Sequence, residues 1–374
     1  MAFEIIYSGY DGLDLSYRTF LPDHILGVLR SAKAEASKSH SGVAVSLGGK
    51  ECIVSGSGAF GGYQFNVDTG QLGETWLIKE AERSDPWGCR VSIKSLPLAL
   101  FGAEEMKRRC DNFLLGLGAH LRPMDCRVSR VDFAIDMLIP DFELDPNHFV
   151  CHSKSKKTDY RQMETTRAGD VISGVRIGKM PNKQLAVYDK RQDVITKKKD
   201  YWWDIWSQYA QRNIAQDQTV WRFEIRAGRN AIDSFYQGTC WELISHCFSS
   251  LLSEVALRIR MTRPQLDTNR SRWPDDPIWT GCRAHIANIP PHRPSILDPK
   301  AILAKLENER RMQLANQYFG LETSLAASIG YEAEDFDKFL LGIADIRNER
   351  IEMAGEAFEK NLCMKRSVWI ARFS

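Results

Sequence analysis

Three segments of the chain alternate chemically reactive side chains with apolar ones: residues 130–136 (RVDFAID), 184–190 (QLAVYDK) and 221–226 (WRFEIR). Successive side chains of a β-strand point to opposite faces of a sheet, so each segment would present one polar face and one apolar face. If the three polar faces join in one sheet, carboxylates, guanidinium groups and a tyrosine hydroxyl come together. Metal-assisted cleavage of a phosphodiester by a tyrosine nucleophile requires these groups.

Tyr188 is the candidate nucleophile, and Lys190 and Arg222 are the candidates that would act on the phosphate beside it. A free tyrosine has a pKa of about 10 and is protonated near neutral pH, so it needs a base or a nearby cation before it can attack. Each residue also has a purely structural interpretation. Tyr188 could be a half-buried strand tyrosine, and Lys190 could be an ordinary solvated lysine.

Asp132, Asp136 and Glu224 are the candidate metal ligands. Carboxylate oxygens are hard ligands that favour Mg²⁺ or Mn²⁺ over zinc. The alternative is that these carboxylates form cross-strand ion pairs with the arginines of the same faces. The two interpretations predict the same alternation, and the pattern does not separate them.

The histidines and glycines exclude other chemistry. The eight histidines are scattered and form no HxH pair, which argues against a zinc site and against the two-histidine metal site of HUH nickases. Gly48-Gly49-Lys50 lacks the GxxxxGK[ST] frame of a phosphate-binding loop. Any ATP-driven unwinding would therefore come from another protein.

The bulk composition is that of an ordinary globular protein, with 374 residues, 43% hydrophobic and 26% charged residues and a formal charge of +2. The nine cysteines form no CxxC pair, as expected of reduced thiols, and no apolar run is long enough for a membrane span. With no recognisable secretion signal, we expect a soluble cytoplasmic protein without membrane contact.

Local basic clusters are candidate DNA contacts even though the total charge is nearly zero. They are the run Lys197, Lys198 and Lys199 and the pair Arg270 and Arg272. The alternatives are that the lysines are merely solvated and that the two arginines pair with nearby carboxylates such as Asp275 and Asp276.

The elements that would position these groups indicate an α+β fold, with a central antiparallel β-sheet, flanking helices and a C-terminal helical module. Residues 3–20 read as a hairpin that turns at Gly9–Gly12, and residues 42–98 read as a glycine-punctuated meander. A long helix is predicted over 230–261. The aromatic block 201–206 could stack on unpaired bases, but packing onto the sheet is favoured.

A proline-rich stretch suggests where the chain divides. We predict a catalytic domain over residues 1–264, an irregular proline-rich arm over 265–298 and a helical module over 299–374.

Taken in order, the motifs resemble the replication initiation factor family, also called Rep_trans. The family includes rolling-circle replication initiators of plasmids and filamentous phages and relaxases of some integrative conjugative elements. The resemblance spans about residues 3–275. It rests on residues 129–136 (SRVDFAID), 177–179 (IGK) leading into 185–190 (LAVYDK), 221–226 (WRFEIR), and 7–13 (YSGYDGL), which fit the family's first strand.

The resemblance implies a bacterial nickase in which Tyr188 takes the 5′-phosphate of a cut strand and Asp132 and Glu224 belong to the metal site, with Asp136 the weaker match. It implies origin DNA, extruded as a hairpin and then nicked, as the substrate. Host helicase and DNA polymerase would be partners, and a homodimer is left open. The alternatives are a conjugative-element relaxase with the same chemistry and an origin-binding regulator that does not cut. The helical module has no counterpart in the family.

Overall fold

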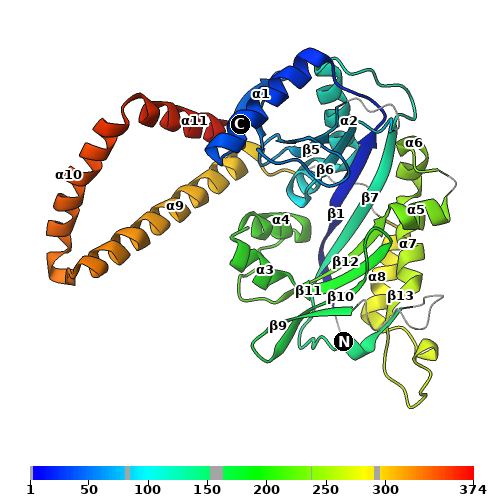
Figure 1. Ribbon diagram of the computed structural model, residues 1–374. Helices are drawn as coiled ribbons and strands as arrows, with labels where there is room; N and C mark the ends of the chain where they lie inside the picture. The colour runs from blue at the N-terminus through cyan, green and yellow to red at the C-terminus, as the bar shows by residue number, and fades with distance from the viewer. Residues whose placement is uncertain (1–2, 81–84, 152–162, 237, 290–294) are drawn as a thin grey trace.

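The computed structural model describes residues 3–80, 85–151, 163–236, 238–289 and 295–374. Its centre is one large sheet in which all the strand pairs are antiparallel, as the sequence predicted (Figure 1). The strands follow one another across the sheet in the order β2 (Val43–Leu47), β3 (Lys50–Val54), β4 (Phe65–Asp68), β5 (Glu74–Ile78), β6 (Cys89–Ile93), β1 (Glu4–Tyr17), β7 (Cys126–Leu138), β12 (Val220–Gly228), β11 (Lys183–Asp189), β10 (Val171–Gly178) and β9 (Met163–Ala168).

β1 is one continuous strand of 14 residues, so the predicted hairpin over residues 3–20 is wrong. It pairs with β7 along its length and accommodates irregularities at three points. The glycines taken for a turn instead make room for side chains that cross the sheet. A Cβ atom on Gly12 would lie 2.9 Å from Asp132 Oδ2, and one on Gly9 would lie 2.4 Å from the Tyr7 hydroxyl.

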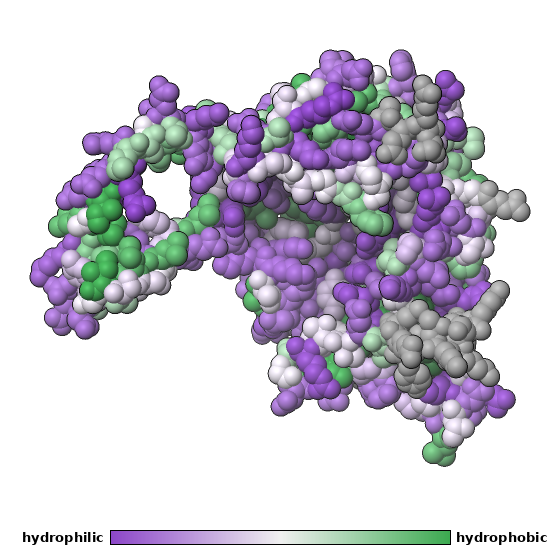
Figure 2. All heavy atoms as spheres, in the orientation of Figure 1, coloured by the Kyte–Doolittle hydropathy of each residue, from purple (hydrophilic) through white to green (hydrophobic). Residues whose placement is uncertain are grey.

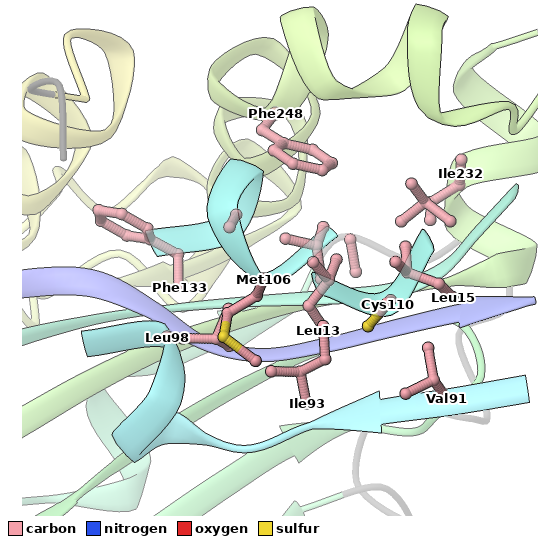
Figure 3. Packing of buried hydrophobic residues seen from close by; sticks show 14 of the residues in the cluster. Leu13, Leu15, Val91, Ile93, Leu98, Met106, Cys110, Phe133, Ile232 and Phe248 are labelled. Carbon is pink, nitrogen blue, oxygen red and sulfur yellow. The ribbon is translucent and has the colours of Figure 1, made fainter. Parts of the chain in front are cut away.

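A helical layer covers the apolar face of the sheet. Figure 3 shows Leu13 and Leu15 of β1 packed with Met106, and with Phe248 and Ile232 on the facing helices. The apolar residues that alternate with the candidate site residues on β7 and β12 belong to the same core. The helices of this layer are α2 (Ser95–Gly116), α5 (Arg229–Phe235), α6 (Trp241–Ile244), α7 (Phe248–Arg258) and α8 (Pro277–Ala287).

Two predictions for this layer are wrong. The long helix expected over 230–261 is divided into α5, α6 and α7 and ends in β13 (Ile259–Met261), which pairs with β8 (Phe149–Cys151). The stretch 265–298 is not irregular throughout, because it contains α8. Pro277 begins that helix, where its missing N–H is tolerated, and the Asp276 side chain accepts a hydrogen bond from the backbone of Ile278.

The opposite, polar face of the sheet is covered by α3 (Lys190–Lys197) and α4 (Tyr201–Ala210). The aromatic block lies on α4, and Trp202, Trp203 and Trp206 are buried against the sheet. The packing interpretation of this block is therefore confirmed.

Beyond the sheet, the predicted C-terminal helical module is present as α9 (Pro299–Ile329), α10 (Phe336–Ala354) and α11 (Glu356–Phe373). Figure 1 shows α9 leaving the body and α11 returning to it, where α11 contacts β2 and β3, near the remaining helix α1 (Asp23–Ser39). Hydrophobic residues gather where α9 meets α10 (Figure 2). None of the helices in the described ranges is both long and apolar enough to cross a membrane.

Candidate active site

The three alternating segments are adjacent strands, and their polar side chains form rows across one face of the sheet. In the first row Tyr188 of β11 faces Arg222 of β12, which in turn faces Asp136 of β7. Four residues further along, Arg226 of β12 faces Asp132 of β7. Glu224 lies on β12 midway between Arg222 and Arg226, and the residues opposite it on both neighbouring strands are alanines. The face predicted from alternation is therefore assembled.

The first row is centred on Arg222, a guanidinium with no solvent exposure. Its Nε donates to Asp136 Oδ1 at 2.6 Å, and its Nη2 donates to Asp136 Oδ2 at 2.7 Å. Nη1 donates to Asp11 at 2.5 Å, and the guanidinium carbon lies 4.4 Å from the centre of the Trp202 ring. We call Arg222, Asp136 and Asp11 the deep row.

Asp136 is engaged on both oxygens, because Trp206 Nε1 also donates to Oδ2 at 2.7 Å. A carboxylate held by three donors in a buried position serves as the counter-ion of Arg222, which differs from the metal-ligand role predicted for it. The buried Arg222 likewise does not line the groove described below, so it underlies the site rather than facing a substrate.

The second set of charges has buried carboxylates but more exposed arginines. It consists of Asp132, Glu224, Arg130 and Arg226, which we call the outer row. Arg130 donates to both oxygens of Asp132, through Nε at 2.9 Å and through a shorter contact from Nη2. Arg226 Nε lies 2.7 Å from Glu224 Oε1 and 3.9 Å from Asp132 Oδ2. One guanidinium therefore lies between the two carboxylates, so the ion pairs of the alternative interpretation are present.

Burial raises the pKa of Asp132 to about 7, although the hydrogen bond and charge of Arg130 oppose the rise. The nearby negative charge of Glu224 also raises it, and Arg226 lowers it. A carboxyl group with such a pKa is partly protonated at neutral pH, and an added cation would favour its charged form.

The Tyr188 hydroxyl donates a long hydrogen bond of 3.4 Å to Glu224 Oε2, the oxygen that Arg226 does not hold. Tyr188 is half-buried. Burial raises its pKa well above 10, the charge of Arg222 opposes the rise, and Glu224 adds to it. The phenol is thus protonated at neutral pH, and an acceptor for its proton is already in place.

Lys190 follows at the junction of β11 and α3, where Asp189 caps the helix by accepting a hydrogen bond from the backbone of Gln192. Its Nζ lies 2.8 Å from Asp193 and 5.7 Å from the centre of the Tyr188 ring. Burial lowers the pKa of this lysine, with the charge of Arg222 lowering it further. The ammonium is therefore held by Asp193, with the Trp202 ring at 5.2 Å and the Tyr188 ring slightly further away.

A groove of about 470 Å³ opens over Tyr188. β9 and β10 supply one group of its lining residues and α3 with the turn after it supplies another, and Tyr188, Glu224 and Arg226 also line it. Of the three lysines predicted to contact DNA, Lys197 and Lys199 line the groove and Lys198 does not. Lys197 is also paired with Asp193 at 2.5 Å.

Arg270 and Arg272 lie elsewhere, on a short 3-10 turn after β13. Arg270 donates to the carbonyl oxygens of Asn147 and Phe149, the latter at 3.0 Å, and Arg272 lies 3.7 Å from Asp267. Both arginines thus have local partners, although Asp267 and backbone carbonyls take the place of the two aspartates expected from the sequence. These residues do not line the groove.

The structure also brings to the site residues that the sequence interpretation missed. Asp11 reaches Arg222 from the supposed turn of the first hairpin. Glu164 and Arg176 line the groove from β9 and β10. The alternation of residues 171–178 was a usable signal for Arg176, whereas the pairing of β9 with β10 was not visible in the sequence.

The donor set for a metal ion is small. Within the described residues, no cluster of three or more histidine, cysteine, aspartate or glutamate side chains is arranged to hold a metal. Glu224 remains beside the tyrosine, and Asp132 lies on the far side of Arg226 from it and does not line the groove. Mg²⁺ is commonly bound by one or two carboxylates together with substrate phosphates and water, so this pair fits a magnesium or manganese ion shared with the substrate.

Comparison with known proteins adds little. No protein-family model matches the chain, and no curated protein matches it. Among solved structures, the chain is similar to one described as a rolling circle replication initiator protein from Geobacillus stearothermophilus, with 13% sequence identity and a TM-score of 0.39. The similarity covers 79% of this chain and 99% of that one.

Proposed function

We propose that this protein is a rolling-circle replication initiator that nicks and rejoins one DNA strand through Tyr188. The single observation that carries the proposal is the placement of the Tyr188 hydroxyl. It lies beside a carboxylate oxygen, at 3.4 Å, and lines a groove that also contains lysine and arginine side chains. A phenol with a proton acceptor and cations around it is the arrangement that tyrosine attack on a phosphodiester needs.

In the proposed step the Tyr188 oxygen attacks the phosphorus of the scissile phosphodiester. Its proton passes to Glu224 Oε2, the bond from phosphorus to the 3′-oxygen breaks, and the departing oxygen takes up a proton from water to become a free 3′-hydroxyl. The 5′-phosphate remains esterified to Tyr188, and attack by a 3′-hydroxyl reverses the step and rejoins the strand. Lys190 supplies positive charge next to the phosphate in both directions.

Asp132 and Glu224 would hold the divalent cation. When bound, Mg²⁺ or Mn²⁺ polarises the phosphate and stabilises the charge that develops on it. Arg226, which lies between the two carboxylates, keeps them in place while they are not shared with a cation. Arg222 acts as a positioning residue, because it faces Tyr188 across the sheet while Asp136 and Asp11 hold it.

On this proposal the substrate is an origin, extruded as a hairpin, from which the free 3′-hydroxyl serves a host DNA polymerase while a host helicase unwinds the duplex. The protein would work in the bacterial cytoplasm. A relaxase of a conjugative element would use the same site, and the DNA that carries the gene distinguishes the two.

The test is covalent capture. Oligonucleotides tiled across the DNA that carries the gene are incubated with the protein and Mn²⁺, and adducts that survive denaturant are resolved on a gel. The wild type is expected to form an adduct with one oligonucleotide, and Tyr188→Phe is expected to form none. Tyr209→Phe is the matched control, because its hydroxyl bonds to Ser8 and does not line the groove. An adduct in Tyr188→Phe would assign the nucleophile elsewhere, and no adduct in the wild type would indicate a non-cutting regulator.

A further inference from the structure

We propose that Arg176 binds the phosphate next to the scissile one, so that the cut strand runs over β9 and β10. The inference rests on the proposed function and deepens it by giving the path of the single strand. Arg176 lies on β10 in the polar face, and its guanidinium is about half exposed.

The register of the outer strands places Arg176 beside the nucleophile. Gly174 of β10 faces Tyr188, and Arg176, two residues further along, faces Ala186, which in turn faces Glu224. Diagonal neighbours on one face of an antiparallel pair are about 7–8 Å apart, which an arginine side chain spans easily. A phosphate bound by Arg176 would therefore be close to the one at Tyr188.

Small residues cover the sheet surface between Arg176 and Tyr188. A Cβ atom on Gly174 would lie 3.2 Å from Tyr188 Cβ and 3.5 Å from Thr166 Cβ, so a larger residue there would crowd the tyrosine. Ala186 provides the same clearance beneath Arg176. An extended single strand of DNA can therefore lie directly on the sheet, with its sugar-phosphate backbone against Arg176 and Thr166.

Arg176 forms an exposed ion pair that a phosphate could replace. Its Nη1 lies 2.9 Å from Glu164 Oε2, and the two side chains are 49% and 72% exposed. An ion pair that exposed contributes little to stability, so exchanging Glu164 for a phosphate costs little. A guanidinium also matches a phosphate in bidentate geometry. Glu164 thus competes with DNA for Arg176.

The experiment measures binding without cleavage, in a Tyr188→Phe background. Fluorescein-labelled oligothymidylate is titrated at several salt concentrations and followed by anisotropy. Arg176→Gln is expected to weaken binding on the order of fivefold and to reduce the salt slope by about 0.7, the value for one lost single-strand phosphate contact. Arg167→Gln is the matched control, because this arginine is exposed on the same β-ribbon and does not line the groove.

Glu164→Gln is expected to change the affinity for DNA in the opposite direction. Freeing Arg176 and removing a negative charge is expected to tighten binding, and the gain should vanish in the Glu164→Gln, Arg176→Gln double variant. Arg176→Gln that binds like Arg167→Gln, or Glu164→Gln that weakens binding, would overturn the inference. Either result alongside a normal wild-type adduct would leave the nicking proposal intact. A missing adduct with the expected binding changes would overturn the nicking and leave Arg176 as a phosphate contact for single-stranded DNA.

Discussion

The deep row and the outer row of the polar face both pair an arginine of β12 with a carboxylate of β7, yet their side chains are engaged differently. In the deep row Asp136 and Arg222 exclude water and satisfy each other, with Trp206 completing the hydrogen bonds of the aspartate. In the outer row Glu224 has one oxygen on Arg226 and the other directed to Tyr188. The difference lies in the contacts: Trp206 of α4 takes up an oxygen of Asp136, whereas one oxygen of Glu224 faces the tyrosine hydroxyl.

Removing the outer carboxylates should have the largest effect on activity. Asp132→Ala and Glu224→Ala are each expected to abolish Mg²⁺- or Mn²⁺-dependent cleavage of the captured oligonucleotide, because a site with two protein ligands loses half of them. Cleavage of the wild type should stop in excess EDTA and return with added Mn²⁺. Activity that persists in EDTA would contradict the metal role and leave the carboxylates as ion-pair partners.

Breaking the deep row should instead cost stability. Asp136→Ala leaves the Arg222 charge buried with Asp11 as its acidic partner, and loss of one member of a buried pair typically costs about 3–5 kcal/mol. Urea denaturation measures the free energy of unfolding, with Asp132→Ala as the control on the same strand. The comparison fails if Asp132→Ala destabilises the protein as much as Asp136→Ala does.

The sequence could predict the face but not its division into rows. Strict alternation predicted that Asp132, Asp136, Tyr188 and Glu224 would lie together, because strand periodicity is a local property of the backbone. The same periodicity treats Asp132 and Asp136 alike. Both are buried, and the difference between them is one of partners: Trp206, on a helix far along the chain, donates to Asp136, and no local pattern contains that contact.

The glycines and prolines show the same limit of prediction from local sequence patterns. Gly9 and Gly12 predict a turn as readily as they predict close packing within a strand, and only the pairing with β7 selects the second meaning. Asp11 was missed for that reason. Similarly, Pro277 was taken as part of an irregular arm, although proline is equally common in the first turn of a helix.

The smallest of these effects concerns Asp193, which links Lys190 beside the deep row to Lys197 at the rim of the groove, at 2.8 and 2.5 Å. Burial alone would raise the pKa of Asp193, but the charges and hydrogen bonds of the two lysines lower this pKa to about 2. A carboxylate whose pKa is lower in the folded state stabilises the protein above its unfolded pKa of about 3.9, and this contribution is lost as pH falls toward 2. Asp193→Asn should therefore lower the free energy of unfolding at pH 7 by roughly 2 kcal/mol.

The pH dependence separates this effect from a simple loss of packing. The gap between wild type and Asp193→Asn should narrow below about pH 4, as the wild-type carboxylate loses its charge. Asp204→Asn is the control, because that aspartate forms an exposed pair with Lys305 at 3.2 Å and should change stability by less than about 1 kcal/mol at any pH. A gap that stays constant with pH would show that Asp193 acts through shape rather than charge. Lys190 would then be held in place by its packing against Trp202. The charge of Asp193 would not link Lys190 to Lys197 at the groove.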